Sequence, residues 1–200
     1  MKRWISGAIV LLGLAGCATV GQKSVVDYMD AATAARERGD WEGARALYAR
    51  SFEDANLAHT SPRFRAVLHY EYGRALGVTC QFRKAEEELT AAHDLDKKSG
   101  GVFYISLAEL ARLNLAQKKY AEAAGYFERV LVELDPQIIA KKAPDFYVAV
   151  LEDHALALAG AGRQQEADDV SKRAAAIRAE DPEAESWAGD ERTPYGTRCK

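Results

Sequence analysis

Apolar residues recur at helical spacing along most of the chain between residues 25 and 181. Apolar positions three to four residues apart are typical of amphipathic helices. Four short turns interrupt the pattern, with a helical stretch before and after each turn and an alanine at the same offset in every turn. These anchor alanines are Ala44, Ala85, Ala123 and Ala167. The pattern predicts an all-α protein of about eight helices, arranged as four helix–turn–helix units.

The anchor alanines recur about every 40 residues, which divides the helical region into four repeats. The approximate repeats are 25–61, 62–101, 102–142 and 143–181. Inter-repeat turns are expected at Asp54–Pro62, Lys97–Gly101 and Asp135–Pro144. A loose C-terminal tail is expected over residues 182–200. The sequence therefore indicates one solenoid of stacked units, in which each unit packs on its neighbours.

The residue types around each turn resemble the tetratricopeptide repeat (TPR), in its longer kinesin-light-chain form. An aromatic residue opens the second helix of the first three repeats, at Trp41, Phe82 and Tyr120. In the first helix of the second repeat, the large Tyr72 precedes the small Gly73. Small residues let two helices approach closely, and an aromatic ring fills the gap that remains. The resemblance implies a right-handed superhelical solenoid with a concave groove.

The N-terminus carries positive charge followed by an apolar stretch. Lys2 and Arg3 precede the run Trp4–Leu14, which is shorter than the roughly 20 residues of a membrane-spanning helix and fits the apolar region of a signal peptide. The following run Leu14-Ala15-Gly16-Cys17 resembles a bacterial lipobox. In a lipobox the cysteine receives a diacylglyceryl group and becomes the mature N-terminus.

This resemblance implies a cleaved signal peptide over residues 1–16, and a lipidated Cys17 with a short tether over residues 17–24. By similarity to sorting in Gram-negative bacteria, Ala18 directly after the cysteine favours the outer membrane, with the domain facing the periplasm. An ordinary cleaved signal with a chance cysteine, or a buried N-terminal helix, is the alternative at this point.

Charge and motif content exclude several classes of function. The 200 residues carry 27 Lys and Arg against 30 Asp and Glu, a formal net charge of −3, so there is no basic surplus for holding a nucleic acid. The sequence contains no P-loop, GxSxG or HExxH motif. Its four histidines include no pair three or four residues apart. We therefore expect no enzymatic activity, no metal site and no cofactor.

Candidate binding residues come from the first helix of every repeat. The sixth position of this helix is acidic in all four: Asp30, Glu71, Glu109 and Asp153. In the family, this position lies on the concave groove. Arginines follow three residues later in the second and third repeats, so Glu71–Arg74 and Glu109–Arg112 are same-face helical pairs. Met29 and Tyr70 are neighbouring groove candidates.

Two interpretations fit these acidic positions. The groove presents them to a partner helix or to an extended peptide carrying basic groups, or they form a charge ladder that keeps a narrow groove soluble and fixes the helix spacing. The carboxylate clamp found in part of the family is not expected, because Met29, Tyr70 and the acids occupy the places of its lysine and asparagine.

Two cysteines remain after lipidation, Cys80 in a turn and Cys199 in the tail. An envelope location permits a disulfide between them, which would hold the tail near the turn of the second repeat. Sequence alone does not show that they are close, so free thiols and a loose tail are the alternative. Trp187 and Tyr195 are further signs of a docked tail.

These features predict a lipid-anchored interaction scaffold of the bacterial cell envelope, with an envelope protein or peptide held in its concave groove. The expected role is assembly or accessory work in an envelope machine. The alternative is an accessory lipoprotein that binds a small ligand for a solute transporter. That alternative calls for a deep apolar cavity ringed by aromatic residues.

Overall fold

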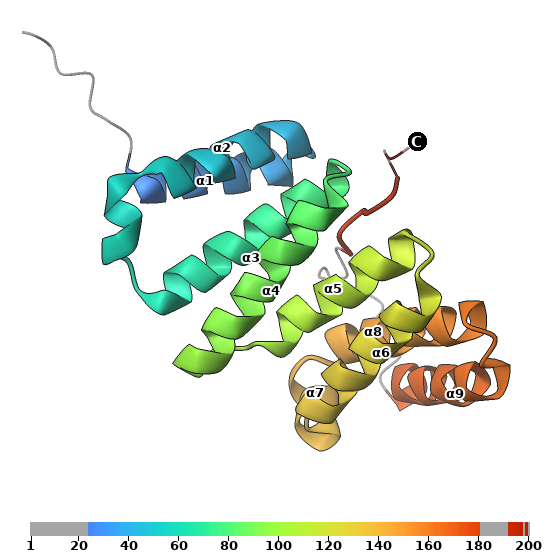
Figure 1. The fold of residues 1–200 in the computed structure, drawn as a ribbon. Helices are drawn as coiled ribbons and strands as arrows, with labels where there is room; N and C mark the ends of the chain where they lie inside the picture. The colour runs from blue at the N-terminus through green and yellow to red at the C-terminus, as the bar shows by residue number, and fades with distance from the viewer. Residues whose placement is uncertain (1–23, 181–191, 198, 200) are drawn as a thin grey trace, which may run out of the picture.

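The computed structural model describes residues 24–180, 192–197 and 199. In these residues it contains nine α-helices, one 3-10 helix and no strand (Figure 1). The elements are α1 Val25–Glu37, α2 Trp41–Glu53, η1 Ala55–His59, α3 Pro62–Val78, α4 Phe82–Ser99, α5 Tyr104–Ala116, α6 Tyr120–Glu133, α7 Pro136–Lys142, α8 Pro144–Gly160 and α9 Gln164–Glu180. The all-α prediction is confirmed.

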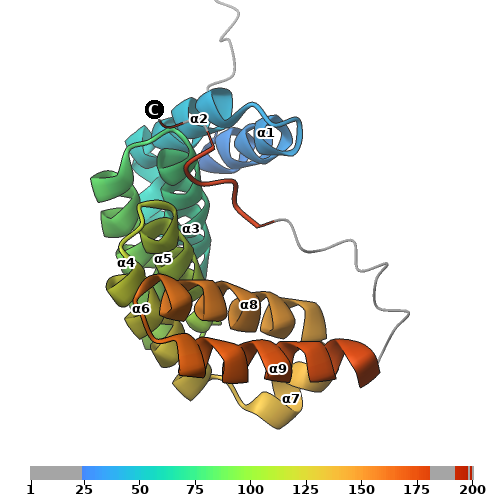
Figure 2. The ribbon, with the colours of Figure 1, turned by 90° about the vertical axis from the view of Figure 1, so that its right-hand side faces the viewer.

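The helices stack as pairs in a curved row. α1 packs against α2, α3 against α4, α5 against α6 and α8 against α9, and each second helix also contacts the first helix of the next pair. Figure 2 shows the row as an arc, with α1 and α2 at one end and α8 and α9 at the other. The four predicted helix–turn–helix units are therefore present.

Small residues set the distance between helices. The anchor alanines are all buried: Ala44, Ala85, Ala123 and Ala167. In the second repeat, Gly73 lies so close to Leu89 that a Cβ at Gly73 would come within 2.8 Å of Leu89 Cγ. Between repeats, the Tyr120 ring of α6 packs over Gly160 of α8, where a Cβ would lie 2.4 Å from the ring. Larger residues at these two glycines would force the helices apart.

The first and third inter-repeat stretches contain the short helices η1 and α7, so the prediction of plain turns there is wrong. Asp135 caps α7 by accepting hydrogen bonds from the backbone N–H groups of Gln137 and Ile138, at 2.9 and 3.2 Å. Pro136 suits the first helical position because its missing N–H would have no helical partner there. Pro144 then begins α8.

The N-terminal predictions concern residues before the described part of the chain. The signal peptide over residues 1–16, the lipidated Cys17 and the tether up to residue 23 all lie outside the described residues. Among the helices that are described, none combines the length and the apolar character needed to cross a bilayer.

Candidate interaction groove

The last described residues of the chain lie across the concave side of the helix row. Residues 192–197 and 199, called the C-terminal segment from here on, contain a turn but no helix or strand. Figure 2 shows this segment inside the arc, ending close to α2 and α3. The end of the predicted tail therefore docks on the repeats, whereas Trp187 lies outside the described residues.

Charges of alternating sign line this concave side. On α3, Nη1 of Arg74 lies 3.2 Å from Oε2 of Glu71, and its Nε lies 3.9 Å from Oε2 of Glu109 on α5. Arg112 Nη1 is 3.0 Å from Glu109 Oε1, and Arg112 Nε is 2.7 Å from Asp153 Oδ2 on α8. We call these five residues the charge ladder. The ladder joins three successive repeats and contains both same-face pairs predicted from the sequence.

The first repeat departs from the predicted pattern. Asp30 is exposed on α1 and is not part of the charge ladder, and Met29 is buried in the core at 9% exposure. The expected groove position of Met29 is therefore wrong, whereas the groove position of Asp30 stays a prediction. Thr33 stands where the second and third repeats have arginine, and it shares a 3.5 Å contact with the Tyr48 hydroxyl. The ladder is instead extended by Arg36, whose Nε lies 3.5 Å from Glu71 Oε2.

Three side chains of the C-terminal segment bind the charge ladder and its neighbour Glu152. Arg192 Nη2 donates to Glu152 Oε2 at 2.8 Å, and Arg192 Nε lies 3.2 Å from Asp153 Oδ1. Arg74 Nε donates to Thr193 Oγ1 at 2.8 Å. The Tyr195 hydroxyl donates to Glu109 Oε2 at 2.7 Å. The segment therefore places one cation and two hydroxyl groups on α3, α5 and α8.

The ring of Tyr195 packs against a glycine of α3, where any side chain would occupy its space. Tyr195 is 8% exposed, and a Cβ at Gly77 of α3 would lie 2.4 Å from its Cε1. Beside it, the Arg74 guanidinium lies 5.4 Å from the ring centre of Tyr70 and 5.9 Å from that of Trp41. The predicted groove residue Tyr70 thus holds a ladder cation by a cation–π contact.

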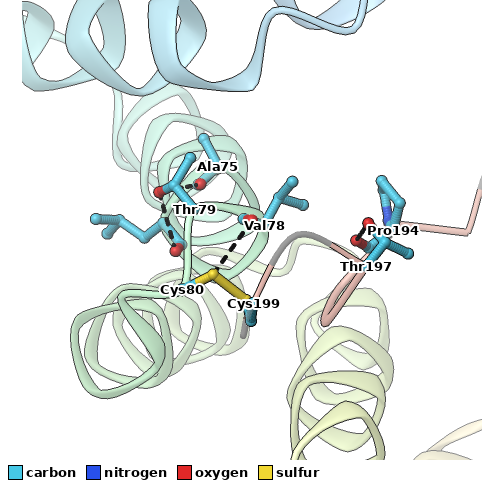
Figure 3. Close-up of a disulfide and its surroundings, with 8 residues drawn as sticks. Ala75, Val78, Thr79, Cys80, Pro194, Thr197 and Cys199 are labelled. Carbon is cyan, nitrogen blue, oxygen red and sulfur yellow. Dashed lines mark hydrogen bonds between the residues drawn. A yellow bond between two sulfur atoms is a disulfide. The ribbon is translucent and has the colours of Figure 1, made fainter.

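A disulfide joins the C-terminal segment to the second repeat. Cys80 and Cys199 are bonded, with Cα atoms 5.6 Å apart (Figure 3). Cys80 occupies the turn between α3 and α4 with a φ of 66°, and the preceding Thr79 donates from its hydroxyl to the carbonyl of Ala75 at 2.8 Å. Of the two possibilities left open by the sequence, the structure contains the bonded form. The bond ties the end of the segment to the turn of the second repeat.

The buried charges hold one another in their ionised forms. Burial alone raises the pKa of Glu109, which is 3% exposed, but Arg112 and Arg74 bring the pKa below its usual value. Burial and the Glu109 carboxylate raise the pKa of Tyr195 well above its usual value. The phenol therefore stays protonated and donates a hydrogen bond to this carboxylate. Burial lowers the pKa of Arg112, but Glu109 and Asp153 outweigh this and raise it.

Both interpretations of the acidic positions therefore apply in part. The charge ladder links helices of successive repeats, as the spacing interpretation expects. It also binds an extended peptide with a basic residue, as the groove interpretation expects, although this peptide belongs to the chain itself. Sequence patterns inside the repeats do not reveal Arg36, Arg192 or Thr193 as members of the site, because their contacts come from other faces or from the distant tail.

Part of the concave side stays open beside the charge ladder. A cavity of about 260 Å³ lies between the first halves of α3 and α5. Its lining is mixed: apolar and aromatic side chains from Val67, Tyr70, Val102 and Ile105, and polar or charged ones from Arg63, Glu71, Asp96 and Ser106. Two further cavities have volumes of about 330 and 460 Å³, beside Trp41 and between α8 and α9. None of these three cavities is ringed by the aromatic residues that the small-ligand alternative calls for. The described residues contain no His, Cys, Asp and Glu cluster suited to a metal ion.

The paired helices and their concave side define a TPR-like solenoid, and solved structures share this fold. BtubC from P. vanneervenii matches with a TM-score of 0.70 and 18% identity, over 78% of this chain and 63% of that chain. A putative kinesin light chain with TPR-like repeats from P. anserina matches with a TM-score of 0.63 and 22% identity, over 80% of this chain and 76% of that one. MamA matches with a TM-score of 0.60 and 17% identity, over 80% and 81%.

These likenesses confirm the predicted TPR-like fold. This chain spans less than two thirds of the length of BtubC. No protein-family model matches the sequence, and no curated protein matches it either. Conclusions about binding therefore depend on the geometry of the groove itself.

Proposed function

We propose that this protein is an interaction scaffold that holds an extended segment of a partner protein against its concave side. The observation that carries the proposal is the C-terminal segment, which lies there without helix or strand and is bound by side chains of α3, α5 and α8. The same TPR-like fold in BtubC, the kinesin light chain protein and MamA supports it at the level of architecture.

The open cavity between α3 and α5 offers such a partner a place beside the charge ladder. Val67 and Val102 at this cavity are 43% and 40% exposed, so a partner segment can reach both side chains. Tyr70 and Glu71 belong to both the cavity and the ladder region, so a partner segment that fills the cavity continues towards the charges. The partner would thus combine an apolar anchor with polar groups.

A bacterial envelope location is the second part of the proposal. The run Leu14-Ala15-Gly16-Cys17 supports it through its resemblance to a lipobox, and a disulfide between Cys80 and Cys199 suits an oxidising compartment such as the periplasm. With Cys17 acylated and Ala18 after it, the protein would be anchored in the outer membrane. Seven residues between Cys17 and Val25 reach at most about 25 Å, so the solenoid would lie close to the bilayer.

Crosslinking in intact cells, followed by capture and identification of the bound proteins, tests the scaffold. We expect Val67→Glu to lose one specific partner protein, because it replaces an apolar side chain of the cavity lining by a carboxylate. The matched control is Val132→Glu on α6, since Val132 is 83% exposed and lines none of the three cavities. Unchanged capture with Val67→Glu would contradict binding at this cavity.

Mass spectrometry of the mature N-terminus tests the anchor. We expect a chain that begins at Cys17 and carries acyl groups. An unmodified chain that begins at another residue would refute the lipoprotein assignment and leave the scaffold proposal to the crosslinking result.

A further inference from the structure

The C-terminal segment binds the repeats through its side chains. None of its described backbone–backbone hydrogen bonds reaches a repeat. Its backbone hydrogen bonds are local, from Tyr195 N to the Thr193 carbonyl at 2.8 Å and from Cys199 N to the Gly196 carbonyl at 3.3 Å. Its described hydrogen bonds with the repeats come from the Arg192, Thr193 and Tyr195 side chains. The groove therefore selects side-chain chemistry in a fixed order: a cation, a hydroxyl next to it, and a phenol two residues further on.

The surface under this segment is organised without the segment's help. Arg112 bridges Glu109 and Asp153 between two repeats, and Arg74 pairs with Glu71 within α3. None of these contacts involves the segment, and the missing side chain at Gly77 provides the space for an aromatic ring. Another peptide with the same three groups then meets oriented acceptors and a donor. Such preorganisation lowers the entropic cost of binding.

One covalent bond keeps the segment in place. The Cys80–Cys199 disulfide lies at the end of the segment, beyond its side-chain contacts. A dithiol reductant breaks this bond by exchange: its two thiols lose two electrons and two protons and close to a disulfide, while Cys80 and Cys199 become thiols. The freed segment is still tethered to α9 at a high effective concentration, but a competing peptide is able to displace it.

We propose that the C-terminal segment is an internal ligand, latched by the Cys80–Cys199 disulfide over a groove that binds a partner peptide of the same chemistry. The partner is an extended segment with a basic residue, an adjacent serine or threonine, and a tyrosine two residues after the hydroxyl. This inference rests on the scaffold proposal and names the partner chemistry for the part of the concave side that the chain itself occupies.

Peptide binding to the full-length protein tests this directly. The probe is a fluorescent peptide of residues 192–200 with Cys199→Ser, and the readout is fluorescence anisotropy. We expect the Thr193→Ala, Tyr195→Ala, Cys199→Ser variant to bind the peptide at least about tenfold more tightly than the oxidised native protein, because its own segment no longer competes. The dithiol-treated native protein should fall between the two.

The peptide controls define the chemistry. A peptide with Tyr195→Phe should bind about tenfold more weakly, because it loses a hydrogen bond to the Glu109 carboxylate, and a peptide of the same composition in scrambled order should not compete. Equal binding of native and scrambled peptides, or no binding to a variant with native helix content, would overturn the inference.

A second measurement covers the case in which the triple variant does not fold. Full-length Cys199→Ser protein is mixed with the disulfide-linked dimer of a peptide of residues 192–200 that keeps its cysteine. The Cys80 thiolate attacks the peptide disulfide, releases one peptide as a thiol, and forms a mixed disulfide, which is quantified. We expect a clear excess over a Tyr195→Phe peptide, and equal yields would overturn the inference. Native dimers linked from Cys80 of one copy to Cys199 of another would support it and identify a second copy as the source of the ligand.

The two proposals fail in different ways. If cells yield a partner that depends on Val67 while the peptide does not bind, the scaffold stands and the internal-ligand inference is wrong. If the peptide binds but cells yield no partner that depends on Val67, the inference stands and the partner site at the open cavity is wrong.

Discussion

The Tyr195 hydroxyl donates a 2.7 Å hydrogen bond to Oε2 of Glu109, a residue 86 positions earlier in the chain. The carboxylate is buried and also faces Arg112 at 3.0 Å. This contact couples the end of the chain to the middle of the solenoid. The C-terminal segment is therefore part of the folded structure and contributes to its stability.

Tyr195→Phe should lower the free energy of unfolding by about 1.5 kcal/mol, because it removes a hydrogen bond to a charged, buried acceptor and keeps the ring. Urea unfolding followed by far-UV circular dichroism measures this. Tyr104→Phe is the control, since the described contact of Tyr104 is with the Phe146 ring and the substitution preserves it. Equal stabilities of the two variants would show that the hydrogen bond contributes little.

Gly77→Ala should lower the free energy of unfolding by about 2 kcal/mol, because the new methyl group would lie 2.4 Å from the Tyr195 ring and 2.7 Å from Leu113. Gly125→Ala on α6 is the matched helical control, since no atom lies within 4 Å of its added Cβ. It should instead raise the stability by about 0.5 kcal/mol. If Gly77→Ala instead raises the free energy of unfolding, the Tyr195 ring does not pack against this position.

Reduction of the Cys80–Cys199 disulfide should lower the free energy of unfolding by about 2–4 kcal/mol, because the bond closes a long loop in the unfolded chain. The two cysteines are 119 positions apart. Chemical unfolding with and without a dithiol measures the difference. The Cys80→Ser, Cys199→Ser variant should be as unstable as the reduced protein and should not respond to the reagent. If the dithiol does not change the free energy of unfolding of the native protein either, the protein lacks this disulfide.

Stability should also fall when the solution becomes mildly acidic. His154 is buried on α8 beside Phe127, and burial lowers its pKa below the usual 6.5, although Glu128 and Glu166 act in the opposite direction and Arg163 adds to the lowering. The unfolded chain therefore takes up a proton at higher pH than the folded protein does. The contribution of neutral His154 to the free energy of unfolding is complete above pH 6.5. It is lost as the pH falls from there towards the lowered pKa.

Free energies of unfolding at a series of pH values measure this loss. His154→Leu should flatten the decline below about pH 6.5, because no buried imidazole remains to be protonated. His59→Leu should leave the slope as in the native protein, since His59 is exposed on η1. A His154→Leu slope equal to that of the native protein would assign the acid sensitivity to other groups.

The repeat architecture follows from local sequence patterns, whereas the site only partly does. The anchor alanines and the Glu71–Arg74 and Glu109–Arg112 pairs are visible because they recur at fixed helical positions. The helix α7 was missed because Asp135-Pro136 fits a turn as well as a helix start. Asp30 stands outside the charge ladder because equal repeat positions do not imply equal partners, and α1 has Thr33 where α3 and α5 have arginine.

The docking of the C-terminal segment lies beyond local patterns. Thr193 and Tyr195 meet the charge ladder from residues far away in the chain, and no periodicity links them to it. The useful signals were Cys80 and Cys199 as a possible pair and a tyrosine close to the second cysteine. Only the three-dimensional arrangement shows that Gly77 provides the space for that ring.

The disulfide closes residues 80–199 into a covalent ring that contains α4 to α9. A solenoid pulled by its two ends normally unravels repeat by repeat from either terminus, because each repeat contacts only its neighbours. Here a tensile force passes from Cys199 directly to Cys80 and bypasses the ring. Only the part of the chain before Cys80 is able to extend, so the third and fourth repeats keep their shape under mechanical load for as long as the bond is intact.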